Sequence, residues 1–190
     1  AGVSARDRVL TNLGEGVAVA VSPEHHRLSS FAAVANDLHA ERHVHAVPGL
    51  EATTHTLGHF NLYPVAPRPG LPRNGAPAVE HISARELFSR LRNLAPRAVL
   101  QVNHPRARGE GYFEVFEPRS GSAPMDFDAL EILNGKRTGD LSRTLGDWFW
   151  LLQHGQVVTA TGGSDSHAVV GEEAGYPRNL IGVVTDDPRA

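Results

Sequence analysis

The residues best suited to chemistry in this chain are its histidines and the carboxylates that accompany them. The chain has 11 histidines among 190 residues and no cysteine. Without cysteine, disulfide scaffolds, thiolate zinc sites and a cysteine nucleophile are excluded. Neutral imidazole and carboxylate together suit zinc, manganese or iron, and a carboxylate can bridge two such ions. The residue types therefore favour a site for divalent metal ions, and the histidines and carboxylates that collect near expected strand ends are Glu24, His25, His26, Glu51, His59, His104, Asp165 and His167.

The elements that must position these side chains are strands alternating with helices. Apolar runs of β type alternate along the chain with segments whose apolar residues have helical spacing. Helices are expected at 5–14, 27–40, 83–94 and 140–154. Strands are expected at 17–21, 44–53, 58–65, 98–102, 129–133, 157–161 and 180–184. This alternation predicts a single α/β domain over residues 1–190 with a largely parallel sheet.

The candidate ligands fall in or next to the expected strands, where their side chains can converge. The carboxyl ends of parallel strands meet at one edge of the sheet, and active sites form there. Imidazoles and carboxylates from four or five strands would therefore meet, although more than 140 residues separate the first from the last. Asp165 and His167 are two residues apart, so in extended backbone both side chains would lean to one side and could serve adjacent ions.

Each candidate also has an ordinary structural explanation. A lone histidine is more often a surface or hydrogen-bonded side chain than a metal ligand. Six histidines without a matching carboxylate are assigned to that class: His39, His43, His45, His55, His81 and His154. Asp165 alone would be a helix cap after a glycine turn, and Asn134-Gly135 alone would be a common turn signal. The recurrence of the same residue types at most strand ends favours the metal site.

Six short motifs follow one another along the chain. They are Pro23-Glu24-His25, Gly49-Leu50-Glu51, Gly58-His59-Phe60-Asn61, Asn103-His104-Pro105, Glu131-Ile132-Leu133-Asn134-Gly135 and Gly163-Ser164-Asp165-Ser166-His167. Their order resembles the polymerase and histidinol phosphatase (PHP) superfamily, and most closely the branch of PHP metallohydrolases that includes carbaryl hydrolases. Gly175-Tyr176-Pro177-Arg178 fits that branch as well. The resemblance covers essentially the whole chain.

The resemblance implies a distorted, usually seven-stranded (β/α) barrel with up to three divalent metals at its mouth. The implied ligands are Glu51 bridging two metals, His59 and His104 on one of them, Asp165 on another, and His25 and His167 sharing a further one. His26 directly follows His25, and the choice between these two imidazoles stays open.

The chain departs from the PHP pattern at its beginning. PHP proteins open with a strand that carries a His-x-His pair, and nothing here matches it, because His25 is the first histidine. The expected barrel is therefore incomplete at the N-terminus and, since the chain stops just after an expected strand, at the C-terminus. The chain would then be a fragment of a longer protein, a homo-oligomer in which a second copy supplies the missing strand, or a metal-poor relative. Fewer than three metals are expected.

The expected reaction is metal-dependent hydrolysis of a small-molecule ester, foremost a phosphoester, by a metal-activated water. His104, Arg106 and Asn134 are the expected catalytic residues. Arg106 would supply a guanidinium to the charged substrate, with a surface arginine as the alternative, and Asn134 would orient substrate or water. A carboxyl-ester or carbamate hydrolase with the same metals is one alternative function. A non-catalytic metal-binding or scaffold module is the other.

Charge and hydropathy argue against two classes of partner. The formal net charge of −3 provides no general positive field for nucleic acid or an acidic membrane. No apolar run approaches the roughly 20 residues that a bilayer span requires. The first residues lack the basic and apolar blocks of a signal peptide. A soluble protein is expected, in a compartment that the sequence does not specify.

Overall fold

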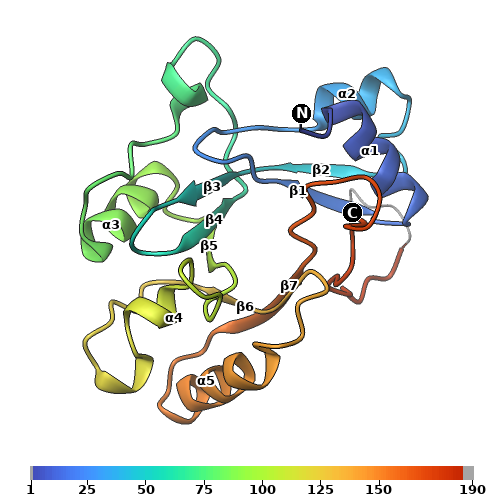
Figure 1. Ribbon diagram of the computed structural model, residues 1–190. Helices are drawn as coiled ribbons and strands as arrows, with labels where there is room; N and C mark the ends of the chain where they lie inside the picture. Colours follow the sequence, from blue (N-terminus) through green and yellow to red (C-terminus); the bar gives the residue numbers. More distant parts are fainter. Residues whose placement is uncertain (1, 186–190) are drawn as a thin grey trace.

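The computed structural model describes residues 2–185, and this part contains five α-helices and seven strands (Figure 1). The helices are α1 (Ala5–Gly14), α2 (Ala32–Asp37), α3 (Ala84–Leu94), α4 (Tyr112–Val115) and α5 (Leu141–Gln153). The strands are β1 (Val19–Ser22), β2 (His45–Pro48), β3 (Leu50–Thr53), β4 (His59–Tyr63), β5 (Val99–Val102), β6 (Ala129–Asn134) and β7 (Thr159–Gly163). Two short 3-10 helices, η1 (Pro72–Gly75) and η2 (Pro118–Ser120), lie in connections.

The main sheet has five strands in the order β3-β4-β5-β6-β7. Strand β4 runs antiparallel to both β3 and β5, whereas β5, β6 and β7 run parallel. The register places Thr53 opposite His59, and the next strand places Val102 opposite Phe60. The carboxyl ends of β3, β5, β6 and β7 and the amino end of β4 therefore lie at the same edge of the sheet.

The main sheet has one apolar and one polar face, because successive side chains of a strand point to opposite sides. The apolar positions pack with α3 and α4 in the main core, and they are Leu50, Ala52, Phe60, Leu62, Leu100, Val102 and Leu130. Between these positions lie polar ones, of which Glu51, Asn61 and Gln101 are direct cross-strand neighbours. The apolar face holds the sheet together with the helices, and the polar face is left to carry a site.

Strands β1 and β2 form a separate two-stranded parallel sheet beside α1 and α2 (Figure 1). This sheet, the two helices and the segments next to them share a small core cluster, made of Val9, Ala20, Phe31, Ala35, Ala40 and Val44. The segment after β1 then pairs with β3. The His26 N–H donates to the carbonyl of Glu51 at 2.8 Å, and the Glu51 N–H donates to the carbonyl of Glu24 at 3.0 Å. These bonds bring His25 to the same edge of the main sheet.

The structure contradicts the expected (β/α) barrel, complete or incomplete. Its described strands form an open mixed sheet and a separate pair. The reason lies in the connection between β3 and β4, which is only residues 54–58. A parallel crossover needs about a dozen residues or more, so two strands joined by so short a segment pair as an antiparallel hairpin. The prediction of a largely parallel sheet overlooked this length.

The expected helices and strands are confirmed in most places and differ in three. The strand expected at 44–53 is divided into β2 and β3, which belong to different sheets. The helices expected at 5–14, 83–94 and 140–154 are present as α1, α3 and α5. The helix expected at 27–40 is shortened to α2, because residues before it form bridges with Glu24 and Gly49. The strand expected at 180–184 is irregular backbone. Leu180 is 91% exposed there, and no strand of the described residues pairs with this apolar segment.

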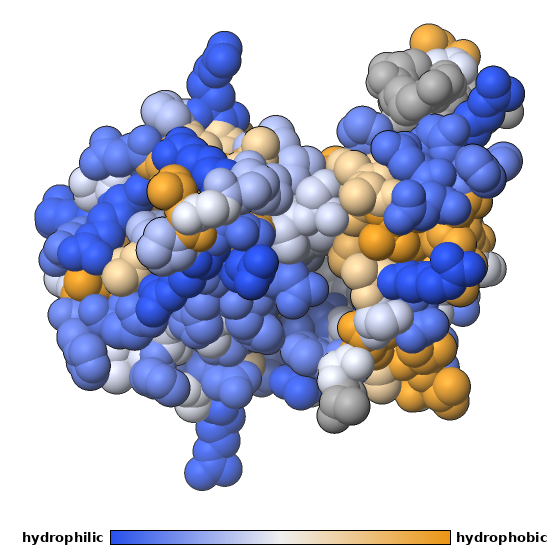
Figure 2. Space-filling view, turned by 90° about the horizontal axis from the view of Figure 1, so that it is seen from above, coloured by the Kyte–Doolittle hydropathy of each residue, from blue (hydrophilic) through white to orange (hydrophobic). Residues whose placement is uncertain are grey.

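Exposed apolar side chains gather at the end of the molecule that carries α1, α2 and the C-terminal segment, whereas the opposite end of the same face is mostly hydrophilic (Figure 2). The exposed apolar side chains of the C-terminal segment are Leu180, Ile181, Val183 and Val184. No helix within residues 2–185 is long and apolar enough to cross a bilayer.

Candidate metal centre

Three potential metal ligands from three strands meet at the shared edge of the main sheet. Glu51 lies in β3, His59 begins β4, and His104 follows β5 by two residues. One ligand atom of each lies within 4.8 Å of the others, with Glu51 and His104 buried and His59 half-buried. The Glu51 Oε1 is 3.3 Å from the His59 Nδ1. One carboxylate oxygen and two imidazole nitrogens in this arrangement suit a divalent metal ion.

His104 has an unusual backbone conformation and an unpartnered ring nitrogen. Its φ is +26°, a left-handed value that histidine seldom adopts, and its N–H donates to the Glu131 Oε2 at 2.7 Å. The imidazole is buried, and its Nδ1 has no hydrogen-bond partner among the described residues. A buried nitrogen without a partner costs free energy, which a bond to a metal would recover.

The pKa of His104 is lowered, mainly by burial and in addition by the charge of His59. The ring is therefore neutral at neutral pH, as a metal ligand must be.

The Glu51 carboxylate is the common neighbour of the cluster. Its Oε1 accepts a hydrogen bond from the Asn103 Nδ2 at 3.2 Å and faces His59, while its Oε2 is 3.4 Å from the His25 Nδ1. Burial alone would raise the pKa of Glu51. The His59 hydrogen bond, the charges of His25 and His59, and the Asn103 amide outweigh burial and lower this pKa. Glu51 is therefore ionised at neutral pH.

A second pair of imidazoles lies beside Glu51 on the solvent side. The His25 Nε2 is 3.5 Å from the His167 Nε2, and the two rings stack with centroids 5.8 Å apart. The His25 Nδ1 also contacts the Thr53 Oγ1 at 2.5 Å. His26 contacts Glu51 through its backbone N–H alone. Of the two adjacent histidines, the structure thus brings the imidazole of His25 into the cluster.

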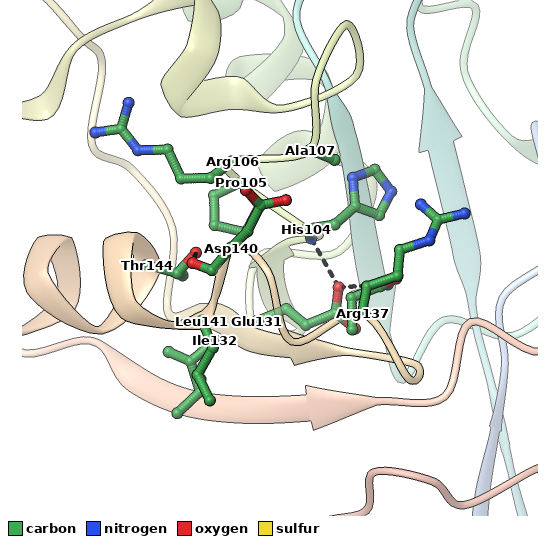
Figure 3. Close-up of a pocket in the computed structure, with 11 residues that line it drawn as sticks. His104, Pro105, Arg106, Ala107, Glu131, Ile132, Arg137, Asp140, Leu141 and Thr144 are labelled. Atoms are coloured by element: carbon green, nitrogen blue, oxygen red, sulfur yellow. Dashed lines mark hydrogen bonds between the residues drawn. The ribbon is translucent and has the colours of Figure 1, made fainter.

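Glu131 of β6 is a buried carboxyl group next to His104 (Figure 3). Its Oε2 accepts hydrogen bonds from the His104 N–H at 2.7 Å and from the Asn134 Nδ2 at 3.0 Å. Burial, the largest effect, together with the charges of Asp165 and Glu51 raises the pKa of Glu131 to about 8 against these two bonds. Glu131 is therefore mainly protonated at neutral pH. It serves as a fixed acceptor that holds the His104 backbone.

A series of hydrogen-bonded polar side chains that ends at Asn103 fixes the orientation of the Glu51 carboxylate. The Tyr63 hydroxyl and the Thr161 hydroxyl both donate to the Gln101 Oε1, at 2.9 and 3.1 Å. The Gln101 Nε2 then donates to the Asn103 Oδ1 at 3.0 Å. With its oxygen occupied in this way, Asn103 directs its own N–H toward Glu51. Partners of this kind fix the orientation of metal ligands in known sites.

Arg106 does not reach the candidate metal centre. Its Nε donates to the Asp147 Oδ2 at 2.5 Å, its Nη1 to the Phe113 carbonyl at 2.6 Å, and its Nη2 to the Glu117 Oε2 at 3.1 Å. The guanidinium points away from His104 (Figure 3). The prediction that Arg106 supplies a guanidinium to the substrate is therefore wrong. Its buried carboxylate partner, Asp147, keeps it in the protein interior.

The other expected site residues lie near the three-ligand group without belonging to it. The Asp165 carboxylate is close enough that its charge acts to raise the pKa of His104, and its Oδ1 is 3.7 Å from the His167 Nδ1. Asn134 lines a small cleft together with His104, and its amide N–H is bound to Glu131. A role of Asn134 toward substrate stays a prediction.

Two supporting residues, Glu131 and Asn103, received no role from the sequence. Both lie inside or directly after apolar strands, at 129–133 and 98–102. A carboxyl or amide group within such a run must be buried, and a buried polar group needs partners. A polar residue within or directly after an apolar strand is therefore the sequence feature from which a supporting role of Glu131 and Asn103 could have been predicted.

No protein-family model, curated protein or solved structure matches the chain. The resemblance to the PHP superfamily stays a prediction that rests on the motifs. The structure itself contains a group, Glu51, His59 and His104, that could hold a divalent metal ion.

Proposed function

We propose that the chain is a metal-dependent hydrolase of phosphoesters, with Glu51, His59 and His104 as the metal ligands. The observation that supports this most strongly is the convergence of these three side chains, one of which, His104, also has a buried ring nitrogen with no partner among the described residues. Buried polar atoms in proteins are nearly always hydrogen-bonded, so an unpartnered one in a cluster of ligand types calls for a binding partner.

The charge states of these residues favour binding of a cation. Ionised Glu51 offers a negative charge in a buried setting, and neutral His104 offers a lone pair without adding positive charge. A divalent metal bound here supplies Lewis acidity and lowers the pKa of a bound water toward 7. Asn103 holds the Glu51 carboxylate and Glu131 holds the His104 backbone. The ligands are therefore positioned before a metal binds.

His25 and His167 are proposed as a second metal position beside the first. The facing Nε2 atoms of the two histidines and the 3.5 Å between them support this assignment. The other ring nitrogen of each histidine faces a carboxylate, with the His25 Nδ1 3.4 Å from the Glu51 Oε2 and the His167 Nδ1 3.7 Å from the Asp165 Oδ1. Carboxylates in this position orient histidine ligands in known metal sites.

The test combines metal binding and phosphodiester hydrolysis in one set of variants. EDTA-treated wild type, His104→Ala and His154→Ala are titrated with zinc or manganese and assayed with bis-p-nitrophenyl phosphate. His154 is an exposed imidazole at the end of α5 that stacks on Trp150, so it is a matched control outside the cluster. We expect His104→Ala to lose more than about 100-fold in metal affinity, together with hydrolysis, and His154→Ala to lose neither. Equal binding and hydrolysis in all three proteins would refute the proposal.

Two other outcomes identify the alternatives. Hydrolysis of naphthyl esters without hydrolysis of phosphodiesters would identify a carboxyl-ester or carbamate hydrolase that uses the same ligands. Tight metal binding by the wild type, lost in His104→Ala and accompanied by no hydrolysis of either ester, would identify a non-catalytic metal-binding module.

A further inference from the structure

The turn that follows β6 brings Arg137 back beside the end of the strand. The Arg137 N–H donates to the carbonyl of Asn134 at 3.1 Å and closes the turn. Gly135 has a φ of +49°, and a Cβ at this position would meet the carbonyl oxygen of Ser164 at 3.1 Å. The turn therefore needs a glycine, and its backbone fixes the point from which the Arg137 side chain starts.

Arg137 lines a small cleft next to the candidate metal centre. The cleft lies between the ends of β5 and β6 and the start of α5, with His104 and Glu131 in its wall. The Arg137 side chain extends toward the side on which the His104 imidazole lies (Figure 3). It is exposed, and within residues 2–185 it forms no side-chain hydrogen bond or ion pair.

The other cationic side chains at this place are bound to carboxylates. Arg106 contributes to the cleft wall, but its guanidinium is held by Asp147. Lys136, the neighbour of Arg137 in the turn, points to Glu173, with its Nζ 2.5 Å from the carboxylate. Among the described residues of the cleft, Arg137 is thus the cation whose charge is not neutralised by a carboxylate.

One carboxylate in the cleft opposes the charge of Arg137. Asp140, at the start of α5, also lines the cleft, and its Oδ1 is 3.8 Å from the Arg143 Nη1. This distance allows only a weak ion pair at the surface, so Arg143 compensates little of the negative charge of Asp140. An anion in the cleft would be attracted by Arg137 and repelled by Asp140. The two residues therefore have opposite expected effects.

We propose that Arg137 binds the anionic group of the substrate and thereby selects phosphoesters over neutral carboxyl esters and carbamates. This inference rests on the proposed function and names the substrate class of the same site. A guanidinium presents its N–H donors in a planar fork that matches two oxygens of a phosphoryl group. Arg137 thus takes the role that the sequence assigned to Arg106.

The first part of the test measures anion binding without hydrolysis. Inorganic phosphate is titrated calorimetrically into each protein in the presence of zinc. Arg137→Gln is expected to weaken phosphate binding at least about tenfold, and Asp140→Asn to strengthen it. Arg90→Gln makes the same change in charge at an arginine of α3 that is paired with Glu86 and lies outside the cleft, and it should leave phosphate binding unchanged. Equal affinity in Arg137→Gln and Arg90→Gln, or no phosphate binding by the wild type, would overturn the inference.

The second part separates the inference from the proposed function. We expect Arg137→Gln to raise the KM for p-nitrophenyl phosphate at least about tenfold, with a smaller change in kcat, and to leave hydrolysis of p-nitrophenyl acetate unchanged. An equal loss on both esters would overturn the role of Arg137 and leave the metal-dependent hydrolase intact. Phosphate binding that depends on Arg137 in a wild type that hydrolyses neither ester would support the anion site and overturn the proposed function.

Discussion

Replacement of Glu131 by glutamine tests whether a protonated carboxyl group supports the candidate metal centre. The protonated acid and the amide have the same shape, and each offers an oxygen acceptor beside a donor group. Glutamine can therefore keep the two hydrogen bonds that Glu131 accepts from His104 and Asn134. We expect Glu131→Gln to be about as stable as the wild type at low pH and more stable than the wild type at high pH.

The sign and the size of this effect follow from the pKa of Glu131, which burial raises from 4.5 to about 8. Between these values the unfolded chain has lost the proton and the folded chain has kept it. The stability that the protonated group contributes is fully present below pH 4.5 and is lost as pH rises toward 8. Each pH unit in this window corresponds to about 1.4 kcal/mol, so the full loss is at most about 5 kcal/mol.

The assay is urea unfolding of EDTA-treated wild type and Glu131→Gln at pH 5, 6, 7 and 8. The two proteins share every titratable group other than Glu131, so the contributions of the shared groups cancel in the difference between the two unfolding free energies. We expect this difference to shift in favour of the variant by up to about 4 kcal/mol from pH 5 to pH 8. A difference that stays constant within about 0.5 kcal/mol over this range would refute the assignment of Glu131 as a buried acid.

Two further predictions concern the packing around the site and use the same urea assay. A Cβ at Gly163 would overlap the Oε1 of Glu131, so Gly163→Ala should destabilise the fold by about 1–3 kcal/mol. Gly139, where a Cβ would meet nothing, is the control, and an equal effect of both alanines would show that the contact does not matter. Asp147→Asn removes the buried one of the two carboxylates that are paired with the buried Arg106 guanidinium, and it should cost up to about 3–5 kcal/mol. Asp126→Asn, in an exposed ion pair, should cost less than about 1 kcal/mol, and similar losses in the two variants would contradict the buried pair.

Local periodicity was sufficient to predict most helices and strands but not the direction of strand pairing. Helix α3 was predictable because its apolar residues form one stripe and Ser83 caps it, and the Ser83 Oγ does accept from the Glu86 N–H at 3.2 Å. Strands β3 and β4 were both expected as strands, but the short connection 54–58 determined that they pair antiparallel. The strand expected at 180–184 shows that apolar composition alone does not produce a strand without a partner edge.

His59 shows why the candidate ligands could be predicted although the barrel was wrong. In a parallel sheet a residue that begins a strand would lie at the edge opposite to His104, which follows one. The antiparallel β4 brings His59 to the same edge, where its carbonyl accepts from the Asn103 N–H at 3.0 Å. The choice of candidate ligands by residue type therefore included three side chains, Glu51, His59 and His104, that lie together in the structure. Arg106 was misjudged because its partner, Asp147, lies 41 residues further along the chain and is brought close by packing alone.

Anomalous diffraction at the zinc edge from crystals of the zinc-loaded protein tests most directly whether Glu51, His59 and His104 hold a metal. We predict a peak at bonding distance, about 2.0–2.2 Å, from a carboxylate oxygen of Glu51 and from one ring nitrogen each of His59 and His104. The same peak should be missing from crystals of His104→Ala grown with zinc. A zinc peak bound to other residues, or none between these three in the wild type at saturating zinc, would contradict the account.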